Sequence, residues 1–231
     1  MQKKATALEG LYVIEDFITE TEEQELIRAI DSRSWCGNGI APNPEMKRRT
    51  QHYGYEFSYR YRKIMQNLGP LPTFTDFIVK RFKQQKIIDF EDEPNMCIIN
   101  EYEAGQGIMP HTDAATIFGP IILSLSLLSS CLMKFTHSNN SETQFLTVLP
   151  PRSLLIMTKS SRYDYKHSIS KDITEWFDGG ENGEKQEIIR SRRVSLTFRT
   201  VRSSGMDNVV GFCFSISFPN DDLSLFKMII L

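Results

Sequence analysis

The chain has 231 residues, the length of one large domain rather than two small ones, and it is 40% hydrophobic and 24% charged, like an ordinary globular protein. Its net charge of −2 excludes the strongly basic composition of a dedicated nucleic-acid binder, so any such contact must come from a local patch. Four cysteines without a C-x-x-C spacing predict free thiols in an intracellular protein, cytoplasmic or nuclear. The sequence shows no signal peptide and no run near the roughly 20 apolar residues of a membrane span, so we expect no membrane partner.

Two helices are predicted in the first third of the chain. Residues 11–18 predict a strand, after which Thr19 and Glu22 form a capping box that begins a helix ending near residue 31. A second helix is predicted over about residues 73–85, because apolar side chains recur there at helical spacing. Its buried stripe comprises Phe74, Ile78 and Phe82.

Between these helices, residues 47–63 interleave basic and aromatic side chains more densely than any other part of the chain. Nucleobases can stack on aromatic rings while Lys and Arg bind phosphates, so this segment is a candidate nucleic-acid contact. A tyrosine-rich surface hairpin is the competing interpretation, because β-propensity alone explains the tyrosines. For His52 we favour a purely structural role over a contact with the substrate. The candidate substrate-binding residues are Arg48, Arg49, His52, Tyr53 and Tyr55.

Residues 95–113 form the stretch around which the chain is organised: a strand, a glycine turn, and a short segment that ends in His111-x-Asp113. Side chains two apart in an extended chain share a face, so Asn100 lies with Tyr102, and His111 lies with Asp113. The glycines between the two pairs allow the backbone to turn.

Short strands are predicted to fill most of the remaining chain. Residues 121–128 alternate leucine with serine, which predicts one dry and one polar face. A hairpin is expected from residues 131–137 and 144–149, followed by an apolar strand at 153–157. Residues 158–165 are predicted to form a loop that delivers His167 to the next segment.

The C-terminal third contains a predicted insertion and one unusual strand. Residues 171–190 are polar and glycine-rich, which predicts a mobile insertion. In the strand predicted at 193–199, four polar residues share one face, which indicates either a lined cavity or a wet surface strand. Residues 203–231 include alternating phenylalanines at 212–218 that indicate an edge strand. The many short strands with early helices predict a mainly β fold, a sandwich or jelly roll with helical support.

The histidines and carboxylates indicate a metal site. An imidazole and a carboxylate on one face need a second histidine to make the 2-His-1-carboxylate triad of Fe(II) oxygenases, which leaves open coordination positions. The residues leave two candidates for that histidine, His137 and His167, although each alone has a structural interpretation. A His-x-Asp spacing is weak evidence for a metal site by itself. Its position before a distal histidine and two arginines strengthens that evidence.

Those arginines, Arg193 and Arg199, lie six apart on one predicted strand face. A 2-oxo acid that chelates Fe(II) through its keto and carboxylate oxygens needs a planar bidentate donor for its far carboxylate, and guanidinium supplies one. Tyr102 and Asn100 can add neutral hydrogen bonds. A buried ion pair is the alternative role for Arg193.

Taken together, these motifs resemble the AlkB-like 2-oxoglutarate- and Fe(II)-dependent dioxygenases over residues 11–202. Within that family the chain looks most like the branch of the eighth AlkB homologue, the tRNA wobble-uridine hydroxylases. The matching elements are Asn100-x-Tyr102, Gly105-Gln-Gly107-Ile, His111-x-Asp113, Pro151-Arg152-Ser153, Arg162-Tyr163, His167 and Arg193-x5-Arg199, with Lys47-Arg-Arg49 and His52-Tyr-Gly-Tyr-Glu-Phe57 for the branch.

The resemblance implies a double-stranded β-helix, a jelly roll with iron between its sheets, over residues 1–202, and leaves 203–231 as an unmatched tail. It implies iron bound by His111, Asp113 and His167, with Fe(II), 2-oxoglutarate and O2 as cofactor and co-substrates. It implies Arg193 for the distal carboxylate of 2-oxoglutarate with Tyr102 beside it. The other co-substrate residues it implies are Asn100, Ser195, where some relatives carry asparagine, and Arg199. The basic aromatic segment then corresponds to the family's nucleotide-recognition lid.

The implied function is hydroxylation or oxidative demethylation of a nucleobase substituent, with tRNA favoured. Rivals are repair of alkylated bases, a protein substrate, and a non-catalytic nucleic-acid-binding domain of the same fold. In the wobble-uridine branch an RNA-recognition domain precedes this region and a methyltransferase domain follows it. Here only ten residues precede the first predicted strand, so we expect such modules from a methyltransferase or RNA-binding partner in trans.

Overall fold

The computed structural model describes residues 4–178 and 185–202. Its helices are α1 (Glu20–Asp31), α2 (Asp76–Gln84) and α3 (Lys159–Tyr163), with 3-10 turns η1 (Thr73–Thr75) and η2 (Phe90–Asp92). Its strands are β1 (Lys4–Ala5), β2 (Leu11–Ile14), β3 (Arg49–Tyr53), β4 (Tyr55–Ser58), β5 (Lys63–Asn67), β6 (Met96–Tyr102), β7 (Ile108–His111), β8 (Ile122–Leu127), β9 (Cys131–His137), β10 (Asn140–Leu149), β11 (Leu154–Met157), β12 (Tyr165–Ile169), β13 (Thr174–Asp178), β14 (Lys185–Ile189) and β15 (Arg193–Arg199).

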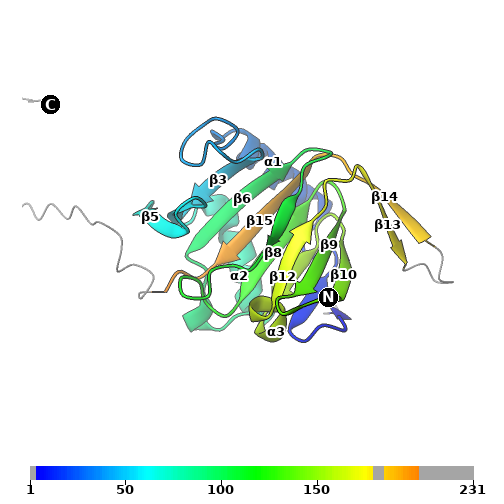
Figure 1. Ribbon diagram of the computed structural model, residues 1–231. Coiled ribbons are helices and arrows are strands. Elements are labelled where there is room, and N and C mark those ends of the chain that lie inside the picture. The colour runs from blue at the N-terminus through cyan, green and yellow to red at the C-terminus, as the bar shows by residue number, and fades with distance from the viewer. Residues whose placement is uncertain (1–3, 179–184, 203–231) are drawn as a thin grey trace, which may run out of the picture.

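Two antiparallel sheets form the body of the molecule (Figure 1). The major sheet has the strand order β1-β2-β11-β8-β15-β6-β3, and the minor sheet has the order β10-β9-β12-β7. Strands far apart in the sequence are neighbours in both sheets, as in a jelly roll with its crossing connections. The prediction of a mainly β jelly roll supported by helices is confirmed.

One hydrophobic core fills the space between the two sheets. It combines inward-facing residues of the major sheet, such as Ile98 and Met157, with Met133 and Phe135 of the minor sheet. The β4–β5 hairpin adds Phe57 to this core. Alternation along each strand places one face in this layer, so the residue adjacent to a core position faces the opposite side of its sheet.

A second core lies between the helices and the other face of the major sheet. Leu26 and Ile30 of α1 and Phe82 of α2 pack there against the dry face of β8, predicted from its leucines. The capping box of Thr19 and Glu22 is present at the start of α1. Both helices thereby cover one side of the major sheet and leave its other side to the interior of the sandwich.

Two segments differ from their predicted structure. The predicted loop 158–165 contains the short helix α3. The predicted mobile insertion at 171–190 contains the β13–β14 hairpin, which projects from the sandwich in Figure 1. Buried Glu175 anchors it by accepting a hydrogen bond from the backbone N–H of Leu132 at 2.8 Å, and Arg190 lies 3.6 Å from the same carboxylate oxygen. These long-range contacts anchor the two strands, whereas the glycine-rich residues 179–184, on which the prediction of mobility rested, lie outside the described residues.

The basic aromatic segment is also divided between two structures. β3 pairs with β6 at the edge of the major sheet, whereas β4 turns into a separate hairpin with β5. The edge strand expected at 212–218 lies outside the described residues. No helix in the described part of the chain combines the length and apolarity needed to cross a bilayer.

Candidate metal and co-substrate site

Two histidines face each other across the minor sheet. His111 at the end of β7 is the direct pairing partner of His167 in β12, and their ring centroids are 4.2 Å apart. Gly107 permits this approach of the strands, because a Cβ there would lie 2.3 Å from the carbonyl oxygen of Ile169. Of the two candidates, His167 and not His137 is thus the neighbour of His111, and His137 pairs instead with Tyr165.

Both imidazoles are neutral near pH 7. Burial lowers the pKa of His111, and burial lowers the pKa of His167 to about 3. The Nδ1 of His111 lies 2.9 Å from the carbonyl oxygen of Met109, which can only accept, so Nδ1 carries the proton and Nε2 keeps its lone pair. Such an orienting bond is typical of a histidine that binds a metal.

Asp113 follows β7 by two residues and is buried beside the histidines. Arg199, at the end of β15, donates to its Oδ1 from Nη2 at 2.8 Å and from Nε at 3.2 Å. Burial opposes ionisation of the carboxyl, but the positive charge of Arg199 above all holds the pKa of Asp113 below its usual range. Its Oδ2 is buried and has no hydrogen-bond partner in the described structure.

These observations test whether the residues fit Fe(II). As the side chains stand, no three His, Cys, Asp or Glu residues in the described ranges are grouped closely enough to hold a metal. The donor chemistry does fit, because two neutral imidazoles in contact and an ionised carboxylate with an orphaned buried oxygen constitute the 2-His-1-carboxylate set. All three residues line one cavity.

A cavity of about 380 Å³ extends from these residues between the sheets. The polar face of β15 lines it, as one interpretation of that strand predicted, with Arg193, Ser195, Thr197 and Arg199. The antiparallel register sets Tyr102 opposite Arg193 and Asn100 opposite Ser195. The five expected co-substrate residues, Asn100, Tyr102, Arg193, Ser195 and Arg199, therefore all line one cavity.

Arg193 is buried at the inner end of this cavity. Its Nη2 donates to the Oγ of Ser126 at 2.7 Å, and its guanidinium lies 5.5 Å from the ring centre of Tyr102. Its Nε is buried without a hydrogen-bond partner, and no ion pair involving Arg193 occurs among the described residues. The ion-pair alternative is therefore wrong, and the guanidinium retains donor capacity for a carboxylate brought by a ligand.

Among the candidate substrate residues, only Arg48 reaches the cavity. It is 8% exposed, and its Nε donates to the Oδ1 of Asn100 at 2.9 Å. His52 shares that strand face but lies behind the cavity wall, where its Nδ1 accepts from the backbone N–H of Phe57 at 3.3 Å. Burial lowers the pKa of His52 to about 4. Tyr55 is part of the core between the sheets.

Arg49 and Tyr53 require a correction. Strand alternation points both toward the helix side of the major sheet, away from the cavity. Arg49 Nη2 donates to Glu101 Oε1 at 2.8 Å. The hydroxyl of Tyr53 donates to Gln51 at 2.9 Å, and its ring packs edge-on against Phe74. The sequence placed both in one basic aromatic patch, but pairing of β3 in the sheet separates them from Arg48.

Two further arginines near the site were not among the candidates. Arg62 lies in the β4–β5 turn and lines the cavity. Arg162, in α3, donates from Nη1 to the backbone carbonyl of Asp113 at 2.8 Å. For Arg162 the signal was its place in the Arg162-Tyr163 motif; for Arg62 it was the density of basic residues at 47–63.

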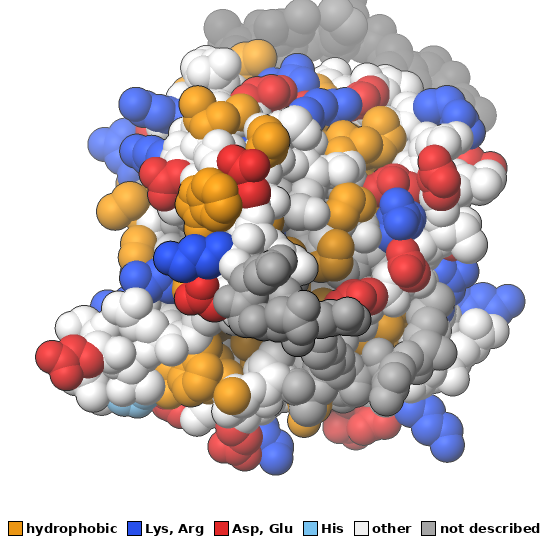
Figure 2. Space-filling view, turned by 90° about the vertical axis from the view of Figure 1, so that its right-hand side faces the viewer, with side chains coloured by type: hydrophobic (Ala, Val, Ile, Leu, Met, Phe, Trp, Pro, Cys, Tyr) orange, Lys and Arg blue, Asp and Glu red, His pale blue; other side chains and the backbone are white. Residues whose placement is uncertain are grey.

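Positively charged side chains predominate around the cavity. Four arginines line the cavity, Arg48, Arg62, Arg193 and Arg199, and Asp113 is the one acidic side chain that the described structure places in its wall. The outer face in Figure 2 differs, since blue and red side chains are intermixed there with hydrophobic ones. The cavity thus selects anionic ligands more strongly than that face does.

Comparisons with known proteins bear on this geometry. Residues 10–199 match the family model described as the 2OG-Fe(II) oxygenase superfamily. The chain is 36% identical to the Xenopus tropicalis "tRNA (carboxymethyluridine(34)-5-O)-methyltransferase alkbh8", over 86% of this chain and 32% of that protein. It is 35% identical to the Arabidopsis thaliana "Alkylated DNA repair protein ALKBH8 homolog", over 84% of this chain and 59% of that protein. The chain thus spans only part of the length of these two relatives.

Solved structures show the same fold at low sequence identity. The structure of OsALKBH1 aligns with a TM-score of 0.58 and 15% identity, covering 86% of this chain and 100% of that one. A Pseudomonas putida prolyl-4-hydroxylase aligns with a TM-score of 0.54 and 12% identity, covering 84% of this chain and 93% of that one. Both alignments show that this chain shares the fold of these proteins.

Proposed function

Because the chain belongs to the 2OG-Fe(II) oxygenase superfamily and is an AlkB-like dioxygenase, we propose that it oxidises a nucleobase substituent in RNA, with the wobble uridine of tRNA favoured. When bound, Fe(II) and 2-oxoglutarate supply the oxidation: O2 and 2-oxoglutarate give succinate and CO2, and one oxygen atom enters a C–H bond of the substrate. A hydroxyl on a stable carbon remains as an alcohol. On an N-methyl group it leads to loss of formaldehyde, which is demethylation.

The protein's part in this reaction is binding and orientation. His111, His167 and Asp113 would hold the iron, because they are the neutral and anionic donors that line the cavity. Arg193 would bind the distal carboxylate of 2-oxoglutarate, with Tyr102 beside it. Asn100 and Ser195 would supply neutral hydrogen bonds along the same wall. Arg199 holds Asp113 in its ionised form.

The observation that carries the proposal is the charge of the cavity. Arg193 and the metal account for the two ends of 2-oxoglutarate, yet Arg48 and Arg62 also line the cavity. These two further guanidinium groups can bind phosphates of a nucleic-acid backbone while the attached base enters the cavity. The relatives named for tRNA modification support RNA as the substrate class.

Two rivals stay open to experiment. A relative from Caenorhabditis elegans is named "DNA N6-methyl adenine demethylase", and 27% identity to it supports alkylated DNA as an alternative substrate. A non-catalytic nucleic-acid-binding domain is the other. It has no need for a buried, orphaned Asp113 oxygen and an unpaired Arg193 Nε, whose burial costs stability unless a ligand compensates it.

A methyltransferase or RNA-binding protein in the cytoplasm or nucleus would serve as a partner in trans.

Succinate release by the purified full chain tests the function. We expect release with Fe(II), 2-oxoglutarate and bulk tRNA to exceed release without nucleic acid, and nucleoside mass spectrometry to find one modified uridine. A preference for methylated DNA would replace RNA by the repair alternative. Tight RNA binding without RNA-stimulated succinate would favour the binding domain. His111→Ala serves as the control for iron-dependent release.

A further inference from the structure

A second, smaller cavity of about 280 Å³ adjoins the first on the side of Asp113. The backbone and side chains of residues 112–117 form one wall, and Arg162 and Tyr163 of α3 form another. Arg62 lines both cavities, so it stands at the boundary between them. No co-substrate or metal residue other than Asp113 contributes to this second cavity among the described residues.

Arg162 makes this cavity positively charged from within. It is 3% exposed, and its two guanidinium donors are directed to the neutral backbone carbonyls of Asp113, at 2.8 Å, and Ala114, at 3.4 Å. Its Nε is buried and has no hydrogen-bond partner in the described structure. A buried guanidinium that bonds only to neutral acceptors retains an uncompensated charge, which favours binding of an anion.

The carboxylate of Asp113 is the obvious counter-charge, and it is already engaged. Its Oδ1 accepts both bonds from Arg199, and its Oδ2 belongs to the proposed iron set. Thr112 and Thr116 add hydroxyl-bearing side chains to the cavity wall. The wall thus combines two guanidinium groups with neutral donors.

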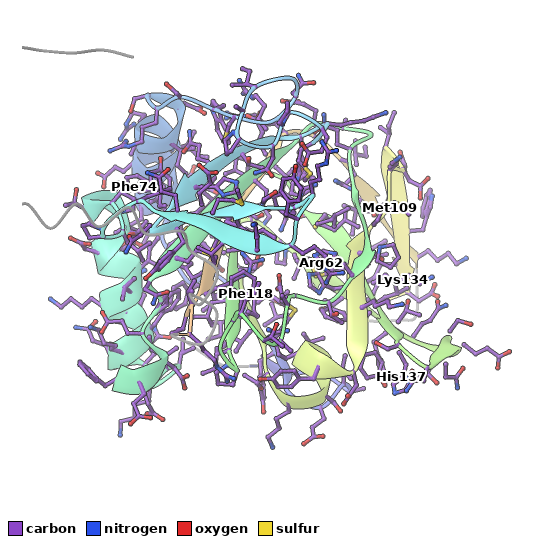
Figure 3. All side chains as sticks on the ribbon, turned by 60° about the vertical axis from the view of Figure 1, so that its left-hand side comes forward. Arg62, Phe74, Met109, Phe118, Lys134 and His137 are labelled. Carbon is purple, nitrogen blue, oxygen red and sulfur yellow. The ribbon has the colours of Figure 1, made fainter. Side chains whose placement is uncertain are left out.

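Arg62 approaches from the opposite side. It lies in the turn between β4 and β5 with a positive φ of 51°, and in Figure 3 it sits between that hairpin and the minor sheet. Its side chain is exposed, and no hydrogen bond or ion pair joins it to another described residue. A free and a buried guanidinium that line one cavity are suited to bind an oxyanion, since guanidinium matches phosphate oxygens with paired N–H donors.

We propose that Arg62 and Arg162 form a phosphate subsite, which binds the backbone phosphodiester next to the nucleotide whose base enters the larger cavity. The subsite rests on the proposed function, because it names how that substrate is held. Sharing of Arg62 by both cavities places the anion and the base side by side, as they are in a nucleotide. The subsite fixes the register of the strand and carries no base specificity.

The test compares Arg62→Gln with Arg60→Gln, a matched control that removes the same charge from the same turn but lies outside both cavities. Binding of an unmodified tRNA anticodon stem-loop is measured by fluorescence anisotropy with the full chain loaded with Mn(II) and 2-oxoglutarate. We expect Arg62→Gln to raise the Kd about tenfold and Arg60→Gln to raise it less than about twofold. The slope of log Kd against log salt should fall by about 0.7 in Arg62→Gln alone. The Kd for 2-oxoglutarate should stay unchanged in both variants.

A neutral methylphosphonate placed at one linkage at a time identifies the phosphate. One linkage should weaken binding of the unaltered protein about tenfold and leave Arg62→Gln unaffected, because a double-mutant cycle is non-additive only for groups that interact. Equal Kd values for Arg62→Gln and Arg60→Gln, or additive effects at every linkage, would overturn the subsite while leaving the function intact. Competition by inorganic phosphate without any sensitive linkage would also overturn it. Failure of the unaltered protein to bind any nucleic acid would remove the function and the subsite together.

Discussion

Arg199 holds Asp113 by two hydrogen bonds to one carboxylate oxygen, from Nη2 at 2.8 Å and from Nε at 3.2 Å. The pair joins the end of β15, in the major sheet, to the residue that follows β7, in the minor sheet. It therefore fixes the carboxylate between the two layers, with its other oxygen free of protein partners. Because the Asp113 side chain is already oriented, less conformational entropy is lost when the metal ion binds.

Loss of this pair should weaken metal binding. We expect Arg199→Gln to reduce the affinity for Mn(II), used as a stable substitute for Fe(II), by about 10- to 100-fold, as for other residues that orient a ligand. Titration calorimetry of the metal-free protein measures it. Arg202→Gln, at an exposed arginine three residues further along, should bind metal like the unaltered protein; equal affinities in all three proteins would show that Arg199 does not orient Asp113.

Removal of an iron ligand should abolish turnover without unfolding the protein. His111→Ala deletes one of two imidazoles in contact at a ring distance of 4.2 Å, so no three-donor set remains for the metal. Succinate release and circular dichroism are measured on the same preparation. His137→Ala, which alters a histidine at the far end of β9, is the matched control. Full activity in His111→Ala would refute the ligand assignment.

Arg193 should determine the affinity for 2-oxoglutarate. Arg193→Lys replaces a planar donor pair by one point charge, and loss of one charge-assisted hydrogen bond corresponds to an increase in KM of about 10- to 100-fold. Arg192→Lys is the control, because Arg192 points to the other face and pairs with Asp31 at 2.6 Å. RNA affinity should change in neither variant. An unaltered KM for 2-oxoglutarate in Arg193→Lys would place the co-substrate elsewhere.

The stability of the metal-free protein should fall in mild acid because of His52. Burial, aided by the charges of Arg199 and Arg48, lowers the pKa of His52 to about 4 in the folded protein, against about 6.5 in the unfolded chain. Between these values only the unfolded state binds the proton, so the free energy of unfolding decreases as the pH is lowered from 6.5 toward 4. Above pH 6.5 the imidazole is neutral in both states, so none of this free energy of unfolding is lost.

At pH 5 the titration of His52 alone lowers the free energy of unfolding by up to about 2 kcal/mol relative to pH 7. Urea unfolding at pH 7 and pH 5 measures it, and His52→Asn, which has no titrating imidazole, should lose less stability between the two pH values than the unaltered protein. The same loss in His52→Asn would mean that His52 is accessible to protons in the folded state.

Local patterns predicted most of the secondary structure and failed where distant contacts decide. The leucine-serine alternation at β8 and the capping box at Thr19 each depend on residues close in sequence, and both were confirmed. The β13–β14 hairpin was missed because Glu175 and Arg190 stabilise it through partners far along the chain. Arg49 and Tyr53 were misplaced because the composition of a segment does not reveal which residues of an edge strand face inward.

The sequence by itself determined the donor chemistry: two histidines, one aspartate and two arginines in an order that few other sites share, on strands whose alternation sets Arg193 and Arg199 on one face. Only the tertiary structure decided which histidine stands opposite His111 and that Arg199 holds Asp113. It also decided that Arg62 lines one cavity with Arg48 and a second cavity with Arg162. The physical reason is that side-chain direction along a strand follows a local period of two. Strand pairing, by contrast, is set by packing between segments more than 50 residues apart, such as β7 and β12.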